Sequence, residues 1–311
     1  MDRMREQRKA QMKKESLLTL ILRDISNPWL LEEKQFINSY RLTSHLVKLL
    51  VDLLHEDVKP KICSKYAIPS HLRVFIAIRF YAQGPYQLGL SKNYKHPCSQ
   101  SSVSKIINKV TNALIKHSEK FINFPQTRER RVATEKRFAE VGACEGTLGL
   151  IDCTMVHLCR PCTAEEAYFN HRHGCHCISC EVVCDADYLV LSLNPFPGSN
   201  ADPFLYKHSK CSGKMFNEML THTRCRVEQL FGQLKGRWRC LNKERMLHYH
   251  PKKACKIIVA CVVLHNFAKL GGVPIAIQHS DDLGHYNYCR NLFSYEAGLQ
   301  EKKNLIRRCY G

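Results

Sequence analysis

One acidic residue stands inside an otherwise apolar stretch of the chain. Asp152 lies in the run 147–158, where leucine, isoleucine, methionine and valine surround it and Gly149 precedes it. The length of the run and its glycine predict a buried strand. Burying an ionised carboxylate is unfavourable unless a cation or several donors meet it. Two interpretations follow: Asp152 caps a turn at a strand edge, or it is a metal ligand.

A second set of metal-ligand types lies at residues 171–180, where histidines and cysteines alternate with other residues. Cys177 and Cys180 have the CxxC spacing of zinc sites, but no second pair follows at a regular distance. The alternative is a hairpin, because the alternating residues 176–183 and the apolar residues 189–193 flank turn-forming residues. We favour the hairpin and do not expect zinc here.

A helix with one apolar side is predicted over residues 216–235. Glu228 lies on a flank of this helix, one turn after Arg224, where an ion pair at that spacing would contribute only a few tenths of a kcal/mol. Basic residues follow the helix and enclose Trp238, a combination that suits phosphate binding. These candidates for phosphate contacts are Lys235, Arg237 and Arg239.

The clearest candidate for DNA recognition is the helix predicted over residues 99–116. Ser99 suits its N-cap, one side is an apolar stripe, and the other side is polar and basic. Such a helix is either the recognition helix of a helix-turn-helix or an ordinary amphipathic helix with a solvated basic face. Glutamine pairs with adenine, whereas lysine takes guanine or phosphate. The base-contact candidates are Gln100, Ser101 and Ser104, and the backbone-contact candidates are Lys105 and Lys109.

Composition narrows the class of partner. The 311 residues include 47 Lys plus Arg against 28 Asp plus Glu, a formal charge of +19, so a polyanion is the natural partner and a membrane surface its rival. The chain has no uninterrupted apolar run of about 18 residues and a charged N-terminus, so we expect neither a membrane span nor secretion. The 17 cysteines follow no regular framework, which favours reduced thiols in the nucleus or cytoplasm.

The remaining patterns predict helices before and after the predicted strands in the sequence. Residues 36–54 carry apolar side chains at helical spacing, and a second helix begins at Ser70 and ends at Gly84. Residues 254–270 are apolar almost throughout and predict a buried helix. The overall expectation is an α+β protein.

Several short motifs occur in a fixed order along the chain. They are Gly-Leu-Ile-Asp-Cys-Thr (149–154), Tyr-Phe-Asn-His-Arg (168–172), Cys-Asp (184–185), Pro-Gly-Ser (197–199) with Asp202, Arg-Val-Glu-Gln-Leu-Phe-Gly (226–232), Lys-Gly-Arg-Trp-Arg-Cys-Leu (235–241) and Leu-His-Asn (264–266). In this order they resemble the PIF/Harbinger transposases and the Harbinger transposase-derived nucleases of animals. The segment Ser-Gln-Ser-Ser-Val-Ser (99–104) is similar to the helix-turn-helix signature of that family.

The resemblance implies an RNase H-like nuclease domain that holds two divalent metal ions, Mg²⁺ or Mn²⁺, on a DDE triad. Asp152 matches the first acid and Glu228 the third. The second acid has no counterpart, because residues 208–213 run almost directly into Phe216 and a central strand segment is missing. Asp185 and Asp202 match other family positions and are weak candidates as metal ligands. The resemblance also implies entry into the nucleus with a Myb-like protein partner.

The expected domain order combines both lines of reasoning. It is a basic N-terminal tail (1–35), an all-helical helix-turn-helix domain (36–125), a linker (126–146), an incomplete RNase H-like α/β nuclease domain (147–270) and a C-terminal tail (271–311). We expect a protein of the nucleus, present also in the cytoplasm, and leave its oligomeric state open.

The missing acid sets the expected activity. Two carboxylates about 4 Å apart repel by roughly 4 kcal/mol at an effective dielectric near 20, so converging acids need cations. Asp152 and Glu228 could hold one Mg²⁺ weakly, whereas in-line cleavage uses two ions. We therefore expect a transposase-derived, metal-dependent nuclease with weak or absent activity. The alternative is a sequence-preferring DNA-binding protein without catalysis; an RNA-binding or scaffold protein is disfavoured because no RNA-recognition signature appears.

Overall fold

The computed structural model describes residues 27–61, 64, 67–84, 98–143, 146–199 and 226–274, together with scattered positions between residues 3 and 21. The chain divides into two compact units, each discontinuous in sequence. Unit 1 comprises Met1–Phe121, Arg237–Leu247 and Lys252–Pro274, and unit 2 comprises Ile122–Gly236, His248–Pro251 and Ile275–Gly311. Among the described helices, none combines the length and apolar character that a membrane crossing requires.

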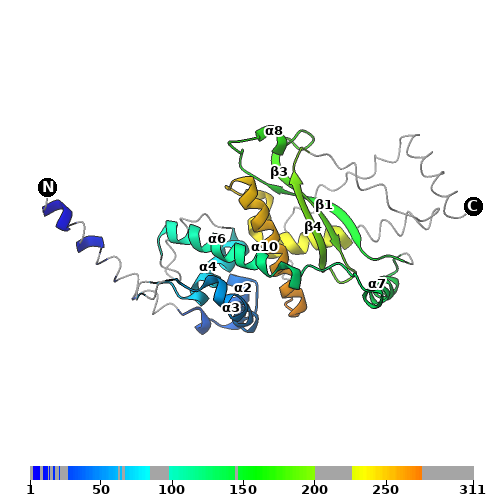
Figure 1. Ribbon diagram of the computed structural model, residues 1–311, viewed down its shortest axis with the longest axis horizontal. Helices are drawn as coiled ribbons and strands as arrows, with labels where there is room; N and C mark the ends of the chain where they lie inside the picture. Colours follow the sequence, from blue (N-terminus) through cyan, green and yellow to red (C-terminus); the bar gives the residue numbers. More distant parts are fainter. Residues whose placement is uncertain are drawn as a thin grey trace, which may run out of the picture. The chain divides into compact units, whose positions relative to one another are not determined.

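Unit 1 is helical (Figure 1). Its helices are α2 (Glu33–Tyr40), α3 (Ser44–Val58), α4 (Ser70–Gln83), α6 (Gln100–Lys116) and α10 (Pro251–Leu270). Four aromatic rings form the core between α2, α4 and the short 3-10 helix at Pro28–Leu30, with ring centroids 4.7 Å apart for Trp29 and Phe75 and 4.8 Å apart for Tyr40 and Phe75. Edge-on aromatic packing of this kind adds to the stabilisation from apolar burial.

The helix predicted over residues 36–54 is two helices in the structure. Helix α2 ends because Arg41 adopts a left-handed conformation with φ of 61°. Helix α3 then begins with Thr43 as N-cap, whose side chain accepts a hydrogen bond from the Leu46 amide at 3.3 Å. The apolar spacing continues across the break, so periodicity alone could not reveal it, although Thr43 carried the signal of a new N-terminus.

The predicted limits of the next two helices are confirmed. Helix α4 ends at Gly84, whose φ of 62° suits glycine, and a Cβ there would lie 3.1 Å from the Cys240 Cα. Helix α6 begins after Ser99, whose side chain accepts from the Ser102 amide at 3.2 Å. Residues 85–97, the connection that a helix-turn-helix would need, lie outside the described residues.

Unit 2 is built on an antiparallel sheet. Its strands are β1 (Leu150–His157), β2 (Phe169–Asn170), β3 (Cys175–Cys184) and β4 (Val190–Pro197), with β1, β2 and β4 all paired to β3. Helices α7 (Arg128–Glu140) and α8 (Glu165–Tyr168) belong to the same unit, as does most of a helix at residues 226–237, called here the Glu228 helix. The predicted hairpin of β3 and β4 is confirmed, and the mixture of helices with an antiparallel sheet confirms the α+β class.

The expected domain order stays a prediction, and the two units are divided differently. Residues 237–247 and nearly all of α10, which that order places in the nuclease domain, belong to unit 1 together with the N-terminal helices. Helix α10 is buried on most sides, and at its end a Cβ on Gly271 would lie 2.5 Å from Leu46 of α3. A helix that is apolar on all sides must be surrounded by several other elements. The sequence pattern of the helix does not show which elements these are.

Candidate active site and nucleic-acid interface

Strand β1 places Asp152 on the core-facing side of the sheet. Successive side chains alternate across a strand, and Leu150, Thr154 and Val156 on the Asp152 side are 9%, 3% and 2% exposed, whereas Ile151 on the other side is 47% exposed. Asp152 itself is half-buried, and its Oδ1 accepts a hydrogen bond from the Cys153 amide at 2.8 Å. The carboxylate therefore lies near the beginning of β1, at the margin of the core.

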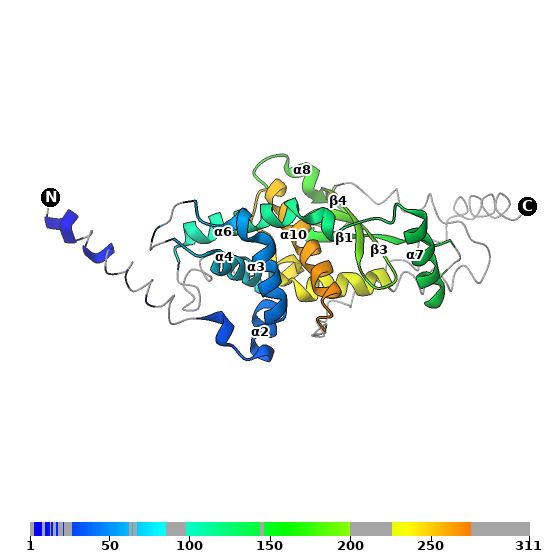
Figure 2. The same cartoon turned by 60° about the horizontal axis from the view of Figure 1, so that its bottom comes forward.

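The Glu228 helix, yellow in Figures 1 and 2, lies next to the sheet in both views and contacts β1 through Lys235. At its first turn Arg226 donates to the Ala186 carbonyl at 3.1 Å, beside the β3–β4 turn. Nine residues later the Lys235 ammonium donates to the Met155 carbonyl at 2.9 Å. Because Leu150 pairs with Cys184 at the same end as that turn, the helix runs from the start of β1 toward its middle.

Glu228 is consequently placed toward the beginning of β1, on the element next to Asp152. The helix buries Val227, Leu230 and Phe231, and Glu228 is half-buried beside that apolar side. Two residues of helix advance only about 3 Å from Arg226, so Glu228 stays near the helix N-terminus. Two acids from distant parts of the chain thus lie on adjacent elements of one unit.

The pKa of the Cys184 thiol depends on the charged side chains at this end of the sheet. Burial is the main cause that raises the pKa of Cys184 to about 12, and the carboxylates of Asp185 and Asp152 raise it further while Arg226 opposes them. The charges of Asp152 on β1 and of Arg226 on the Glu228 helix therefore both act on the same buried thiol. This agrees with the position of the helix N-terminus given by the hydrogen bonds.

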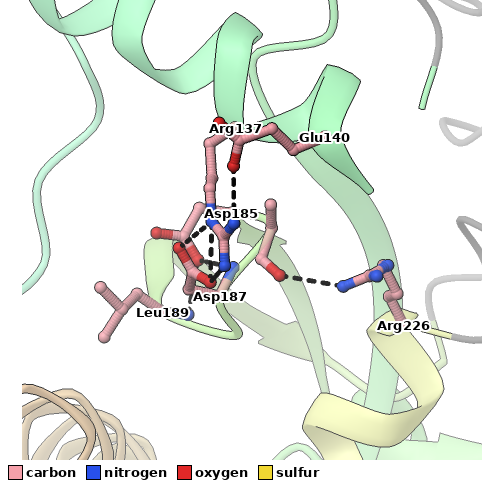
Figure 3. Close-up of polar contacts among 7 residues, drawn as sticks. Arg137, Glu140, Asp185, Asp187, Leu189 and Arg226 are labelled. Atoms are coloured by element: carbon pink, nitrogen blue, oxygen red, sulfur yellow. Dashed lines mark hydrogen bonds and ion pairs between the residues drawn. The ribbon is translucent and has the colours of Figure 1, made fainter. Parts of the chain in front are cut away.

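The weaker metal-ligand candidates have different outcomes. Asp185 closes the β3–β4 turn, since its Oδ1 accepts from the amides of Asp187 at 2.9 Å and Leu189 at 2.8 Å. The Asp187 carboxylate accepts hydrogen bonds from two guanidinium nitrogens of Arg137 in α7. Figure 3 shows Asp185, Asp187 and Arg137 near Arg226. Asp185 is thereby a turn residue in this structure, and Asp202 lies outside the described residues.

Within the described part of the chain, no group of three or more His, Cys, Asp or Glu side chains could hold a metal ion. Among these residues, no third side chain of these types joins Asp152 and Glu228 in such a group.

Residues 171–180 form the beginning of β3 and the turn before it. Cys177 and Cys180 are buried, and their odd separation in the strand directs them to opposite faces of the sheet. His176 contacts the Glu165 carboxylate of α8 at 3.1 Å. The strand interpretation of this segment is confirmed.

The candidate recognition helix α6 presents part of its predicted DNA-facing set to solvent. Gln100, Ser101 and Lys105 are exposed and Ser104 is partly exposed. Lys109 differs, because its ammonium donates to the Lys59 carbonyl at 2.7 Å and caps the C-terminal end of α3. Burial, followed by the nearby charges of Arg73 and Lys61, lowers the pKa of Lys109.

The predicted phosphate role of Arg237 is wrong in this structure. Its side chain is 5% exposed and donates to the carbonyls of Val273 at 3.1 Å and Arg41 at 3.5 Å. Burial, with a smaller contribution from Arg41, lowers the pKa of Arg237 to about 10. The guanidinium joins chain segments of unit 1 and cannot reach a polyanion. Lys235 likewise is held by the Met155 carbonyl.

Sequence reasoning missed Arg41, which accompanies Arg239 in unit 1. Both are partly exposed, and burial and the charge of Arg239 lower the pKa of Arg41. The Arg41 Nε is buried without a hydrogen-bond partner. Across the described residues, no carboxylate forms an ion pair with either guanidinium. Two neighbouring cations without an acidic partner favour the binding of an anion. Only the fold brings Arg41 and Arg239 together, so the sequence alone does not reveal this pair.

Comparison with known proteins agrees with the motif order. The family model described as DDE superfamily endonuclease matches residues 151–216 and 212–266. A Xenopus laevis protein named "Putative nuclease HARBI1" is 27% identical over 285 residues, covering 79% of each chain. The proteins of that name from Bos taurus and Homo sapiens are 25% identical over 281 residues, covering 78% of this chain and 80% of theirs. No solved structure matches. Residues 151–266 are thus similar to the DDE superfamily endonucleases, and most of the chain is similar to the proteins named putative nuclease HARBI1.

Proposed function

We propose that this protein is a transposase-derived nuclease that binds DNA through unit 1 and carries a weak, divalent-metal-dependent phosphodiesterase centre in unit 2. The observation that supports the centre is the position of Asp152 and Glu228 on adjacent elements, both half-buried at the margin of a core. Each carboxylate alone has an ordinary explanation. Together they supply the hard oxygen ligands that Mg²⁺ and Mn²⁺ take.

The two residues fit one divalent ion. Magnesium keeps several waters and is commonly bound by one or two carboxylates together with substrate phosphates, so a third protein ligand is not essential for binding. A bound ion would neutralise charge on the scissile phosphate and lower the pKa of a water. Asp152 and Glu228 would hold the ion, and the apolar side chains beneath them would limit access of water.

The expected loss of a central segment has independent support. The match to the endonuclease family is split into two pieces, 151–216 and 212–266, which overlap at residues 212–216. This is where the motif order lacks the second acid and its strand. An RNase H-like domain without that strand has an incomplete ligand set, which is why we propose slow cleavage at most.

DNA binding rests on exposed groups of unit 1. Gln100, Ser101 and Lys105 lie in the first turns of α6, where a recognition helix contacts bases, and Arg41 with Arg239 forms a cation pair without an acid. We propose that the basic chain acts in the nucleus, with a Myb-like partner. A fluorescent fusion that remained excluded from nuclei with and without such a partner would contradict that location.

A DNA-binding protein without catalysis is the second candidate. The observation that favours it is that no third acidic ligand joins Asp152 and Glu228 among the described residues. Both candidates predict salt-sensitive DNA binding, because each phosphate contact releases counterions and contributes about −0.9 to the slope of log K against log salt. They differ only in metal binding and cleavage.

The first prediction tests the acidic pair. We expect the full chain to bind Mn²⁺ weakly, as measured by electron paramagnetic resonance of free Mn²⁺, and to nick supercoiled plasmid slowly. Asp152→Asn and Glu228→Gln should each reduce Mn²⁺ affinity at least tenfold and abolish nicking, because either substitution removes a charged ligand. Glu140→Gln is the matched control, since Glu140 pairs with Arg137 on the surface of α7.

The outcomes separate the two candidates. Nicking that persists in Asp152→Asn would show that the cleaving centre lies elsewhere or is a contaminant. DNA binding without Mn²⁺ binding or nicking in the wild-type protein would establish the second candidate.

A further inference from the structure

Three arginines from separate segments of unit 1 lie near the C-terminal ends of α2 and α4. Arg41 directly follows α2, Arg79 belongs to the last part of α4, and Arg239 is the first residue of a 3-10 helix at Arg239–Leu241. All three side chains are partly exposed, and all three residues belong to unit 1.

Backbone contacts place the segment of Arg239 beside Arg41 and the end of α4. The Arg237 guanidinium donates to the Arg41 carbonyl at 3.5 Å, and Arg239 follows two residues later. A Cβ on Gly84 would lie 3.3 Å from the carbonyl carbon of Arg239. Burial, and then the charge of Arg239, lower the pKa of Arg41, which agrees with this placement.

Arg79 is placed near Arg41 by Tyr40, the last residue of α2. The Arg79 side chain donates a hydrogen bond to the Tyr40 hydroxyl, and the Tyr40 ring packs on Phe75, one turn earlier in α4, with ring centroids 4.8 Å apart. Although Arg79 opposes the shift, burial raises the pKa of Tyr40 to about 12. The hydroxyl therefore stays neutral and does not compensate the charge of Arg79.

These guanidinium groups lack acceptors for part of their hydrogen-bonding capacity. The Arg41 Nε and the Arg79 Nη1 are buried without a hydrogen-bond partner. Across the described residues, no ion pair joins a carboxylate to Arg41, Arg79 or Arg239. Arg73 and Arg237 differ, because their guanidinium groups donate to backbone carbonyls. Buried donors without acceptors are unfavourable, and in native proteins such donors usually meet a water or an ion.

The backbone of Arg41 is also unusual for an arginine. Its φ of 61° is one that glycine adopts most easily, as Gly84 does at the end of α4 with φ of 62°. An arginine at this position has a conformational cost that glycine would avoid. Its side chain adds a cation beside Arg239.

The helix ends explain only part of this arrangement. The last carbonyls of α2 and α4 carry partial negative charge, which favours cations nearby. The Ile37 and Phe80 carbonyls, however, already accept hydrogen bonds from the amides of Arg41 and Gly84. The helix dipoles therefore attract the arginines but provide no acceptor for the buried Nε and Nη1 atoms.

We propose that Arg41, Arg79 and Arg239 form a binding site for a phosphate group, which comes either from the DNA backbone or from a small phosphorylated molecule. The planar guanidinium group matches two oxygens of a phosphate, and a phosphate has enough oxygens to contact several arginines. Its negative charge offsets the repulsion between the cations. The DNA form of this inference rests on the proposed function, whereas the small-molecule form stands without it.

The experiment uses the full chain and inorganic pyrophosphate in the absence of divalent metal. We expect saturable binding by isothermal titration calorimetry at low ionic strength. The thermal midpoint should exceed that in sodium chloride of equal ionic strength, because a ligand of the folded state stabilises it. Arg41→Gln and Arg239→Gln should each weaken the binding roughly tenfold, since each loses charge-assisted hydrogen bonds.

Arg245→Gln is the matched control, because Arg245 is an exposed arginine of unit 1 six residues after Arg239. It removes the same charge outside the site and should leave the affinity for pyrophosphate unchanged. Arg239→Gln removes no side-chain hydrogen bond to a described residue, so its urea midpoint should match that of the control. Arg239→Lys keeps the charge without the planar fork and should restore only part of the affinity.

Titration with duplex DNA separates the two sources of phosphate. For a site that holds the DNA backbone, pyrophosphate should compete with the duplex, and Arg239→Gln should weaken the binding of both. For a site that takes a small molecule, Arg239→Gln should weaken the binding of pyrophosphate alone.

Two results would overturn the proposal and leave DNA binding through α6 standing. They are the absence of pyrophosphate binding by the wild-type chain and equal losses of affinity in Arg239→Gln and Arg245→Gln. Pyrophosphate binding that depends on Arg239 in a chain that does not bind DNA would support the phosphate site and contradict the proposed function.

Discussion

At the scale of single residues, two arginines close together in sequence have different environments, so residue type alone did not decide which of them is exposed to solvent. Arg237 and Arg239 stand two residues apart on either side of Trp238, which is fully buried. Arg237 points into unit 1 and donates to backbone carbonyls, whereas Arg239 remains partly exposed beside Arg41. A guanidinium can satisfy buried carbonyls or contact phosphate, and the surrounding packing selects between these roles.

The contrast between these arginines gives a matched prediction. Arg239→Gln should reduce the slope of log K against log salt for DNA binding by roughly 0.9, because one phosphate contact is lost. Arg237→Gln should leave that slope unchanged and reduce the free energy of unfolding by about 1.5–3 kcal/mol, because charge-assisted hydrogen bonds to carbonyls are lost. Fluorescence anisotropy across a salt series and urea unfolding measure the two quantities. Equal slope changes in both variants would contradict the structural role of Arg237.

At the scale of elements, the candidate recognition helix depends on its first turn. The Ser99 hydroxyl accepts from the Ser102 amide and also contacts the hydroxyls of Ser101 and Ser102. This cap holds Gln100 and Ser101 in helical positions at the end of α6 that would enter a groove. The remainder of α6 is secured separately by buried contacts such as the 2.7 Å hydrogen bond between Tyr81 and Thr111.

Removal of the cap should therefore act locally. Ser99→Ala should lower the free energy of unfolding by about 1 kcal/mol, since one of the first amides of α6 loses its acceptor. It should also weaken DNA binding, because the frayed turn must order again on binding. Ser101→Ala is the control for stability and should lie within about 0.5 kcal/mol of the wild type. Amide hydrogen exchange at Ser102 that did not accelerate in Ser99→Ala would refute the capping role.

At the scale of the whole molecule, the units are discontinuous in sequence. Helix α10 contributes Ile257, Ile258 and Leu264 to the core of unit 1, and polar contacts hold it there. The Lys256 ammonium donates to Asn112 of α6 at 3.0 Å, and the Asn266 amide donates to the Phe121 carbonyl at 2.9 Å. The N-terminal helices therefore bury part of their apolar surface against a segment more than a hundred residues away.

This arrangement predicts that the helical region of residues 27–124 will not fold properly alone. Without α10, the fragment exposes core surface and should bind the dye ANS and unfold without a sharp transition, as compact but loosely packed states do. The full chain under the same conditions is the comparison. Cooperative unfolding of the fragment at the midpoint of the full chain would contradict the assignment of α10 to unit 1.

Local signals in the sequence determined much of the fold and part of the site. Ser99 and Gly84 specified helix ends because capping and left-handed φ are properties of one or two residues. Alternation specified the β3–β4 hairpin, and the isolated acid in an apolar run identified Asp152 on β1. These features depend on neighbours a few residues away, so the linear chain contains them completely.

Tertiary structure alone decided the features that join distant segments. It placed the Glu228 helix against the strand of Asp152, buried Arg237, enclosed α10 among the N-terminal helices and brought Cys159 to His248. The physical reason is that burial and charge pairing depend on which surfaces meet across long stretches of chain. Residue type and spacing state what each side chain can do, and only packing determines which partner it finds.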